Sequence, residues 1–445
     1  MHTLQALKAG KITLQDLGPE KRLKISEGLT EFPREFFQFA DEVEILDLSG
    51  NQFSDLPNDF ARFKKLKILF LSENRFTHVP AVIGKCENLE MIGFKSNQIK
   101  EVAENALPLK TRWLILTDNK ISKLPNSMGR LTRLRKLALA GNQLTELPDS
   151  MADCGELELI RLSANNLNKM PDWLFELPKL AWLAFSGNPC VKIEQPQASN
   201  LQEVTLDSIR LTEQIGMGAS GVIHRGSWSE PVAGFEQGSE VAVKLFKGEI
   251  TSDGYPQDEL ACCLAAGEHP NLINVLAYIP NKSQLGLVMD LIPPVYANLG
   301  NPPTLKTCTR DTFSEGTIFT LDEIVNVLKQ MARTIHHLHL SGVSHGDAYA
   351  HNILINPEGR VLFGDFGAAT YIKQLSNTQR SLLEKIEVRA LGNLLEDLLS
   401  TIGSEALQNE QSKLVLLRGL VSKCQAINFN NRASLEQLME SLELV

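Results

Sequence analysis

Residues 43–51 read VEILDLSGN, and this nine-residue pattern repeats along the first half of the 445-residue chain. Six further segments share it, and each ends in asparagine: LKILFLSEN (66–74), LEMIGFKSN (89–97), TRWLILTDN (111–119), LRKLALAGN (134–142), LELIRLSAN (157–165) and LAWLAFSGN (180–188). Successive asparagines lie 23, 23, 22, 23, 23 and 23 residues apart. A fixed period of this length predicts a stack of similar turns.

Within each repeat, apolar residues alternate in the manner of a short strand. Leu46 and Leu48 would point inward while the strand pairs with the next turn. The terminal asparagine would satisfy backbone groups where the chain bends. Five of the following loops carry a proline, which suits an outer turn without strand hydrogen bonds. The period of two and the regular prolines argue against amphipathic helices. Leu23 and Ile25 mark an atypical first turn one period upstream.

This pattern resembles the leucine-rich repeat family over about residues 20–192. The resemblance implies an α/β solenoid, a horseshoe of about seven repeats that we assign to residues 1–195. Residues at the third, fifth and seventh motif positions would then line its concave face. An apolar ribbon runs along that face through Ile68, Phe70, Met91, Trp113, Ile115, Leu159 and Trp182. Such a ribbon either docks a protein partner or substrate or packs within the chain, and both interpretations stay open here.

The second half opens on a glycine-rich stretch, LTEQIGMGASGVIHRGSW, at residues 211–228. Its glycines alone could equally begin a dinucleotide-binding helix. The next segments favour a hairpin instead, because VIHRGSW and VAVKLF (241–246) are both strand-like. Bare glycines at the turn of a hairpin let backbone amides approach phosphates, and Lys244 offers them a positive charge.

Two further motifs carry the residue types that phosphoryl transfer needs. HGDAYAHN (345–352) places Asn352 five residues after Asp347, and GDFG places Asp365 thirteen residues after Asn352. Carboxylate and amide oxygens hold Mg²⁺ against phosphates, and a carboxylate orients or deprotonates an attacking hydroxyl.

Taken together, these four motifs resemble the protein kinase family over residues 208–445. The resemblance implies an α+β two-lobed domain, with an N-lobe at 208–289 and a C-lobe at 290–445. Residues 196–207 would be a linker or cap between this domain and the solenoid. ATP and Mg²⁺ are the cofactors that the resemblance implies.

The resemblance also implies a role for each matching residue. Asp347 would be the catalytic base. Lys244 would contact the α and β phosphates and pair with Glu259, fifteen residues further on. Asn352 and Asp365 would be the metal ligands, and Asn352 joins Asp347 and Lys244 in the catalytic set. The other nucleotide-binding residues would be the loop glycines Gly216, Gly218 and Gly221, the roof Val222 and Ala242, the floor Leu354, and Met289 before a hinge of Asp290, Leu291 and Ile292.

Several positions depart from the family pattern. Gly346 stands where many regulated kinases have an arginine that contacts a phosphorylated activation loop, so this switch is not expected. Tyr349 replaces the lysine usual in serine/threonine kinases, which leaves His351 as the only candidate cation in that motif. Only about twenty residues separate Asp365 from a helix in which Glu387 takes the place of the usual aspartate.

The late motif SKCQAINFNNRASLEQLMESL (422–442) resembles the last helices of the family. Arg432 stands there where an arginine normally pairs with a glutamate that this chain lacks, and Glu384 is our guess for its partner. The cluster His336, His337 and His339 has no acidic or cysteine partner at ligand spacing. We interpret it as helix surface and core rather than as a metal site.

Composition limits the remaining function classes. With 44 Lys plus Arg against 53 Asp plus Glu, the net charge is -9, which argues against nucleic acid as a partner. The sequence has no run of 18 apolar residues and its start lacks a signal-peptide pattern, so we expect a cytoplasmic protein with no membrane span. Seven scattered cysteines predict buried thiols.

The leading hypothesis is a protein kinase that uses Mg-ATP, favours Ser or Thr over Tyr as acceptor, and docks proteins through its repeats. The alternatives are a pseudokinase scaffold that binds nucleotide without turnover, and a kinase of small molecules. Tyr349 and the short segment that follows Asp365 favour the pseudokinase, and a small-molecule kinase would require no peptide-docking platform.

Overall fold

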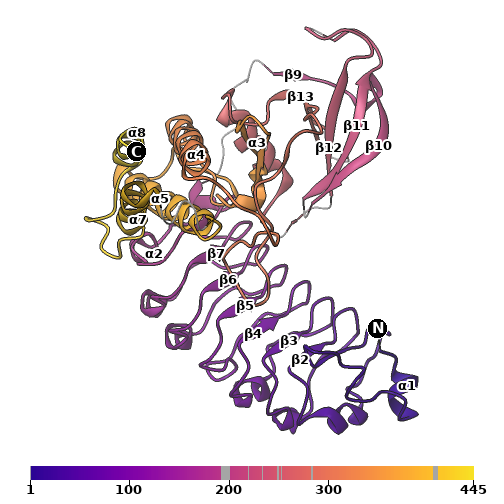
Figure 1. The fold of residues 1–445 in the computed structure, drawn as a ribbon. Coiled ribbons are helices and arrows are strands. Elements are labelled where there is room, and N and C mark those ends of the chain that lie inside the picture. Colours follow the sequence, from indigo (N-terminus) through magenta and orange to yellow (C-terminus); the bar gives the residue numbers. More distant parts are fainter. Residues whose placement is uncertain are drawn as a thin grey trace. The chain divides into compact units, whose positions relative to one another are not determined.

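The structure is a computed structural model that describes residues 2–191, 201–218, 220–232, 234–247, 250–251, 253–281, 284–403 and 409–445 (Figure 1). The chain divides into two compact units, Met1–Leu177 and Pro178–Val445. The division falls inside the last repeat, so its strand β8 (Trp182–Ala184) belongs to the second unit. Residues 196–200 of the expected linker lie outside the described residues.

The first unit is built from short parallel strands, one for each repeat. They are β1 (Arg22–Lys24), β2 (Ile45–Asp47), β3 (Ile68–Phe70), β4 (Met91–Gly93), β5 (Trp113–Ile115), β6 (Lys136–Ala138) and β7 (Leu159–Arg161). Each strand pairs in parallel with the next in sequence order, and equivalent motif positions face one another. Leu46 and Leu48 are fully buried, as the alternation predicts. This confirms the leucine-rich repeat solenoid.

The asparagines form the expected ladder inside the stack. Asn74 Nδ2 donates to the carbonyl oxygens of Leu48 and Leu71 at 3.0 and 3.1 Å. Its Oδ1 accepts from the amide of Phe53 at 2.9 Å. One side chain therefore satisfies backbone groups of two successive turns, which is why asparagine recurs at the bend.

The prolines begin short helical turns on the outer side of the repeats. Pro80, Pro125, Pro148 and Pro171 each directly precede one. The carbonyl of Pro80, for example, accepts from the amide of Ile83 at 3.0 Å. These turns are 3₁₀ segments, except for α2 (Asp172–Phe175), and α1 (Leu4–Lys8) precedes the repeats. The loops are therefore more ordered than the non-hydrogen-bonded turns that the prolines predicted.

The concave ribbon of the first unit is not a uniformly exposed apolar surface. Ile68, Met91 and Leu159 are buried. Phe70, Trp113 and Ile115 are half-buried. Lys136 Nζ lies 4.4 Å from the centre of the Trp113 ring, which adds a cation to the apolar stripe.

The second unit contains an antiparallel sheet to which one edge strand is added in parallel. Its order is β10 (Ile209–Met217), β11 (Gly221–Trp228), β12 (Glu240–Phe246), β14 (Gly286–Asp290), β13 (Val275–Ile279) and β9 (Gln202–Glu203). The helix α3 (Pro256–Ala266) follows β12 in the chain. Trp228, Val243 and Val288 belong to the apolar core of one face of this sheet.

Helices dominate the remainder of the second unit. They are α4 (Leu321–Ser341), α5 (Asn377–Leu399), α7 (Gln411–Cys424) and α8 (Leu435–Glu443). The short strands are β15 (Ala297–Asn298), β16 (Val343–Ser344), β17 (Ile353–Ile355), β18 (Val361–Phe363) and β19 (Thr370–Tyr371). A capping box of Thr320 and Glu323 starts α4, and Gly342 ends it in a left-handed conformation. This mixed sheet and helical part agree with the expected two-lobed α+β domain.

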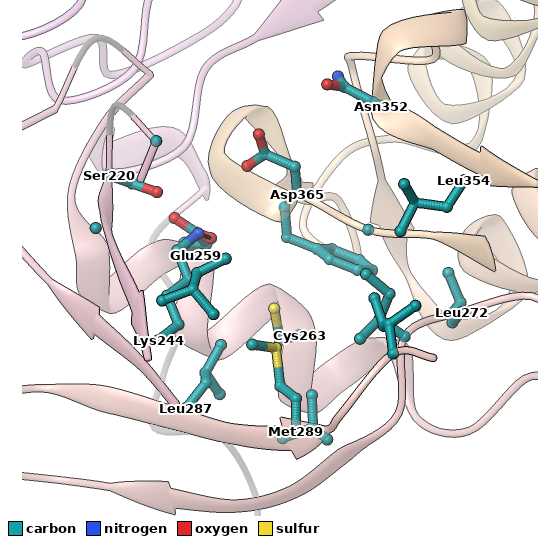
Figure 2. Close-up of a pocket in the computed structure, with 18 of the residues that line it drawn as sticks. Ser220, Lys244, Glu259, Cys263, Leu272, Leu287, Met289, Asn352, Leu354 and Asp365 are labelled. Atoms are coloured by element: carbon teal, nitrogen blue, oxygen red, sulfur yellow. Dashed lines mark hydrogen bonds and ion pairs between the residues drawn. The ribbon is translucent and has the colours of Figure 1, made fainter. Parts of the chain in front are cut away.

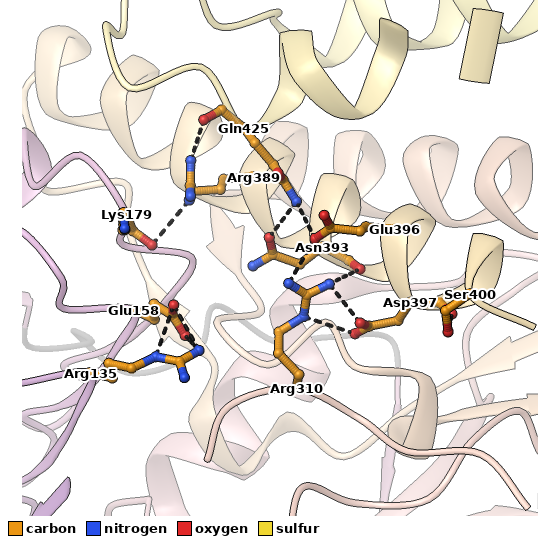
Figure 3. A network of polar contacts seen from close by, with 10 residues as sticks. All are labelled: Arg135, Glu158, Lys179, Arg310, Arg389, Asn393, Glu396, Asp397, Ser400 and Gln425. Atoms are coloured by element: carbon orange, nitrogen blue, oxygen red, sulfur yellow. Dashed lines mark hydrogen bonds and ion pairs between the residues drawn. The ribbon is translucent and has the colours of Figure 1, made fainter. Parts of the chain in front are cut away.

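A cluster of polar contacts joins the loop before α4 to α5 (Figure 3). Arg310 Nη2 donates to Asp397 Oδ1 at 2.6 Å and to the carbonyl of Asn393 at 2.9 Å. Arg310 Nη1 donates to Glu396 at 2.8 Å.

Among the described residues, no helix is long and apolar enough to cross a membrane.

Candidate active site

A cavity of about 320 Å³ lies in the second unit, within the usual size range of small-molecule sites. It is lined by the turn between β10 and β11, by β12, α3 and β14, and by the segments around β17 and after β18. Figure 2 shows Lys244 and Glu259 on one side, Asn352 and Leu354 on the other, and Asp365 between them. Residues more than a hundred positions apart thus meet around one space.

Lys244 and Glu259 form a buried ion pair at this cavity. Lys244 lies on β12 and Glu259 on α3, and Lys244 Nζ donates to Glu259 Oε1. Their side chains are 12% and 4% exposed. Burial opposes the charge on Lys244, but the carboxylates of Glu259 and Asp365 outweigh it and raise the pKa of Lys244. The ammonium is therefore held charged at the cavity wall.

Asp365 and Asn352 bring oxygen atoms to the same cavity. Asp365 has φ of 58°, a left-handed conformation that is unusual for a residue with a side chain. Asn352 is the last residue of a short 3₁₀ turn, Ala350–Asn352, and its Nδ2 donates to Asp347 Oδ2 at 2.8 Å. The amide of Asn352 therefore turns its nitrogen to Asp347 and keeps its own oxygen available.

Asp347 lies on a loop that a hydrogen bond to Glu387 anchors. Glu387 is buried on α5, and its Oε1 accepts from the amide of Gly346 at 2.8 Å. Its Oε2 contacts His339 Nε2. Burial opposes the charge on Glu387, but His339 outweighs it and lowers the pKa of this carboxyl. Glu387, which the sequence analysis placed at the position of the family's usual aspartate, therefore binds the backbone next to Asp347.

Two known protein families match this chain. Residues 209–392 match the model of the protein tyrosine and serine/threonine kinase family. The leucine-rich repeat model matches at 41–99, 110–167 and 132–189.

The chain combines leucine-rich repeats with a protein kinase domain.

The protein kinases similar to this chain each match less than half of it. A probable serine/threonine-protein kinase of Dictyostelium discoideum is 26% identical over 40% of this chain and 12% of its own length. A putative serine/threonine-protein kinase/receptor of Acanthamoeba polyphaga mimivirus is 28% identical over 38% of this chain and 9% of its own. The RAF proto-oncogene serine/threonine-protein kinase of Xenopus laevis is 24% identical over 42% of this chain and 26% of its own. The chain therefore spans only a small part of these relatives.

Among solved structures, a leucine-rich repeat protein of Leptospira interrogans shows a partial likeness. It is 26% identical, with a TM-score of 0.32, and the match covers 40% of this chain and 52% of that chain.

The cavity of the kinase domain brings together most of the sequence-predicted residues. Those that line it are Gly218, Gly221, Lys244, Glu259, Met289, Ile292, Asn352, Leu354 and Asp365. Gly216, Val222, Ala242, Asp290 and Asp347 are not among its described lining residues. Asp347 nevertheless contacts Asn352, which lines the cavity. Asp290 lies in the neighbouring pocket, where Asn274 donates to its carboxylate at 3.1 Å.

The sequence analysis assigned the roof of the pocket to Val222, one residue before the one that lines it. Ile223, not Val222, lines the cavity. Ile223 pairs with Lys244 across the strands β11 and β12, whereas Val222 pairs with Leu245. Successive side chains of a strand point to opposite faces, so only the partner of Lys244 shares its face. The roof of the pocket is therefore formed by Ile223.

The sequence analysis did not predict that Cys263 and His351 line the cavity. Cys263 lies four residues after Glu259 on α3 and hence on the same helix face, a spacing that could have identified it. His351 also lines the cavity, and its Nδ1 lies 2.7 Å from Asp311 Oδ1. Burial opposes protonation of His351, but Asp311 outweighs it and raises the pKa of the imidazole.

Two other sequence expectations have definite outcomes. Arg432 does not pair with Glu384 in the hydrogen bonds that the structure records, because its guanidinium donates to backbone carbonyls and Glu384 Oε1 accepts from the amide of Leu435. The histidine cluster is part of the helix packing: His337 Nε2 lies 2.8 Å from the carbonyl of Ala266, and His339 contacts Glu387. No group of three or more possible metal ligands occurs among the described residues.

Asp258 yields a prediction on stability. Its Oδ2 is buried without a hydrogen-bond partner in the described part of the chain. Desolvation by burial raises the pKa of this carboxyl from 3.8 to about 6. A carboxyl with a raised pKa in the folded state lowers the stability of the fold as the pH rises from its unfolded-state pKa to its folded-state pKa. Above the folded-state pKa the full loss of stability is present. We expect Asp258→Asn to raise the free energy of unfolding at pH 7.5 by about 1–2 kcal/mol.

Thermal unfolding at pH 7.5 and pH 4 checks this prediction. The gain is expected to shrink toward zero at pH 4, where the carboxyl of the wild type is largely protonated. Glu440→Gln, at an exposed position of α8, is the matched control and should change stability at neither pH. An Asp258→Asn variant no more stable than the wild type at pH 7.5 would show that the carboxylate is not costly.

Proposed function

We propose that this chain is an ATP-dependent protein kinase that transfers the γ-phosphate of Mg-ATP to a protein hydroxyl. The observation that carries the proposal is the convergence of Lys244, Glu259, Asn352 and Asp365 on one cavity, with Asp347 bonded to Asn352. Phosphoryl transfer depends on positioning and charge neutralisation, and this set supplies both.

Each residue has a proposed task that its contacts support. Lys244, oriented by Glu259, binds the phosphates at the wall of the cavity. The apolar side chains of Ile223, Met289 and Leu354 offer a slot for the adenine base. Asp347 orients the acceptor hydroxyl and takes up its proton.

The residues present fit a magnesium ion. Mg²⁺ prefers oxygen ligands, and Asp365 offers a carboxylate and Asn352 an amide oxygen at one cavity. The amide nitrogen of Asn352 is engaged by Asp347, which fixes the orientation of its oxygen. When bound, the metal would neutralise phosphate charge. We therefore keep Asn352 and Asp365 as the proposed ligands.

A Ser or Thr acceptor is favoured, because the relatives reported above are serine/threonine kinases. The repeats supply the proposed docking module for a protein partner, supported by the half-buried Phe70, Trp113 and Ile115. A cytoplasmic location stays part of this proposal and is supported by the seven cysteines, whose scattered positions form no disulfide framework in the sequence.

A nucleotide-binding pseudokinase is the second candidate. Tyr349 favours it, because this residue replaces a cation and is 5% exposed, with its ring stacked on Trp182. A small-molecule kinase stays the third candidate, since it needs no peptide-docking platform.

The test of the proposed function is phosphate incorporation by the purified full chain. Incubation with Mg-ATP, first alone and then with a mixture of unstructured Ser-, Thr- and Tyr-containing peptides, should yield phosphoserine or phosphothreonine by mass spectrometry. A melting shift with Mg-ATP but no product would favour the pseudokinase. Phosphate found only on added small-molecule alcohols would favour the third candidate.

His351 gives the transfer reaction an expected pH dependence. As a base whose folded-state pKa is raised, it is fully charged at low pH and loses its charge as the pH rises through the raised value. Its ring lies 5.0 Å from that of Tyr349, which stands in place of the usual lysine. We expect the imidazolium to stabilise the transferred phosphate in place of that lysine, so the rate should fall by about tenfold across that titration. In a profile of rate against pH measured between pH 5.5 and 8.5, His351→Gln should remove this fall in rate at rising pH. A fall that persists in the variant would assign it to another group.

A further inference from the structure

The last repeat of the solenoid contacts the catalytic loop of its own kinase domain within the second unit. The ring of Trp182 on β8 stacks on Tyr349, with centroids 4.3 Å apart and planes 8° from parallel. Trp182 Nε1 donates to the carbonyl of Ala348 at 3.3 Å. Trp182 is 1% exposed, so the contact is fully closed to solvent. Tyr349 and Ala348 follow directly after Asp347, the proposed catalytic base.

A second contact lies on the other side of Asp347. Gly346 has φ of +69°, and a Cβ atom there would lie 2.5 Å from the carbonyl oxygen of Leu183 and 3.0 Å from that of Ala368. No side chain fits such a space. The backbone of the last repeat therefore leaves no room for the arginine that many regulated kinases carry at this position.

The same repeat also reaches the segment after Asp365. The amide of Phe185 donates to Thr370 Oγ1 at 3.2 Å. Thr370 is fully buried on β19, which pairs with β16 just before the catalytic loop. One short stretch of the repeat thus touches both segments that carry proposed catalytic groups.

Buried arginines fix the start of this stretch. Arg389 Nε on α5 donates to the carbonyl of Lys179 at 3.1 Å (Figure 3). Arg432 Nη2 donates to the carbonyl of Pro178 at 2.8 Å. Removal of the stretch would take acceptors from two buried guanidinium groups, which is costly. The contact has the character of a permanent core and not of a releasable cover.

We propose that residues 178–188 of the last repeat are positioning residues for Asp347, and that they hold the catalytic loop in place of a phosphorylated activation loop. The loop contacts the repeat on both sides of Asp347: Gly346 packs closely against the backbone of Leu183, and the carbonyl of Ala348 accepts from Trp182. This proposal deepens the proposed function and rests on it for the role of Asp347.

The test compares Trp182→Ala with Trp173→Ala in the full chain. Both variants truncate a tryptophan, but Trp173 lies on α2 in the first unit, where its Nε1 donates to Asp149 Oδ1 at 3.2 Å. Trp182→Ala should speed hydrogen exchange of the amides of Gly346, His351 and Asn352 by more than about tenfold and lower kcat by about tenfold to a hundredfold. The dissociation constant of Mg-ATP should change by less than about twofold, because Trp182 does not line the cavity. Trp173→Ala should leave the exchange of these amides and kcat unchanged.

The outcomes separate this proposal from the proposed function. Unchanged exchange in Trp182→Ala would overturn it, and so would a raised kcat, which would make the repeat an inhibitory cover. If Trp182→Ala exchanges faster than the wild type but the wild type transfers no phosphate, the positioning contact would be supported and the proposed kinase activity refuted. Trp182→Phe keeps the stacking and loses the Nε1 donor, so it should give an intermediate exchange rate even if Trp182→Ala does not fold.

Discussion

Asp347→Asn is expected to lower the rate of phosphate incorporation by a factor of about 10² to 10⁴. The carboxylate accepts from Asn352 Nδ2 at 2.8 Å and lies beside the cavity that holds Lys244 and Asp365. An amide of the same shape cannot take up the proton of an acceptor hydroxyl. Because Asp347 does not line the cavity, binding of Mg-ATP should change by no more than about twofold.

The rate is measured in single-turnover experiments, and nucleotide binding is measured separately by calorimetry. Asp207→Asn makes the same chemical change at an exposed position of the second unit and should transfer phosphate at the wild-type rate. Equal rates for Asp347→Asn and the wild type would remove Asp347 from the catalytic step.

Arg432→Ala should destabilise the second unit by about 3–5 kcal/mol. The side chain is 2% exposed, and desolvation lowers the pKa of its guanidinium to about 9. Its donors reach the backbone carbonyl oxygens of Ala426, Lys385 and Pro178 at 3.0, 3.3 and 2.8 Å. Truncation to alanine would leave these carbonyls without their donor and open a cavity beside Phe429.

Denaturant unfolding measures this change. Arg418→Ala, at an exposed position of α7, is the control and should alter the free energy of unfolding by less than about 0.5 kcal/mol. Arg432→Lys retains the charge but has fewer donors and a different geometry, so its effect should lie between the two. An Arg432→Ala protein as stable as the wild type would mean that the three carbonyls find other partners.

The repeat solenoid was predictable because each of its rules is local. The alternation of Leu46 and Leu48 requires inward-facing side chains, and the asparagine at position 51 requires a bend whose backbone groups need a partner. Every repeat obeys the same two rules, so the strands and the asparagine ladder could be read directly from the period. The short helical turns after the prolines were less obvious, since proline suits the start of a turn as well as an open loop.

The site was predictable in its charged residues and less so in its apolar ones. Lys244 and Glu259 each need an opposite charge when buried, and their motifs fix their separation along the chain. Val222 and Ile223 are both apolar and adjacent, and only the register with β12 decides which of them faces the cavity. His351 is held at the cavity by a contact with Asp311, forty residues earlier, and no local pattern reveals this contact.

The partners of Trp182 and Arg432 were unpredictable for a related reason. The repeat period placed Trp182 on a strand, but its stacking partner, Tyr349, lies far away in sequence. Arg432 bonds to backbone carbonyls, which every residue has and which leave no trace in the amino-acid sequence. Long-range packing of this kind is fixed by the tertiary fold alone.

The affinity of the full chain for ATP, measured by calorimetry with and without Mg²⁺, tests the nucleotide site most directly. Wild type, Lys244→Met and Asp365→Asn should be compared under the same conditions. We expect ATP binding by the wild type to depend on Mg²⁺ and to weaken by about tenfold or more in each variant. No binding by the wild type, or equal affinities in all three proteins, would contradict a magnesium-nucleotide site at this cavity.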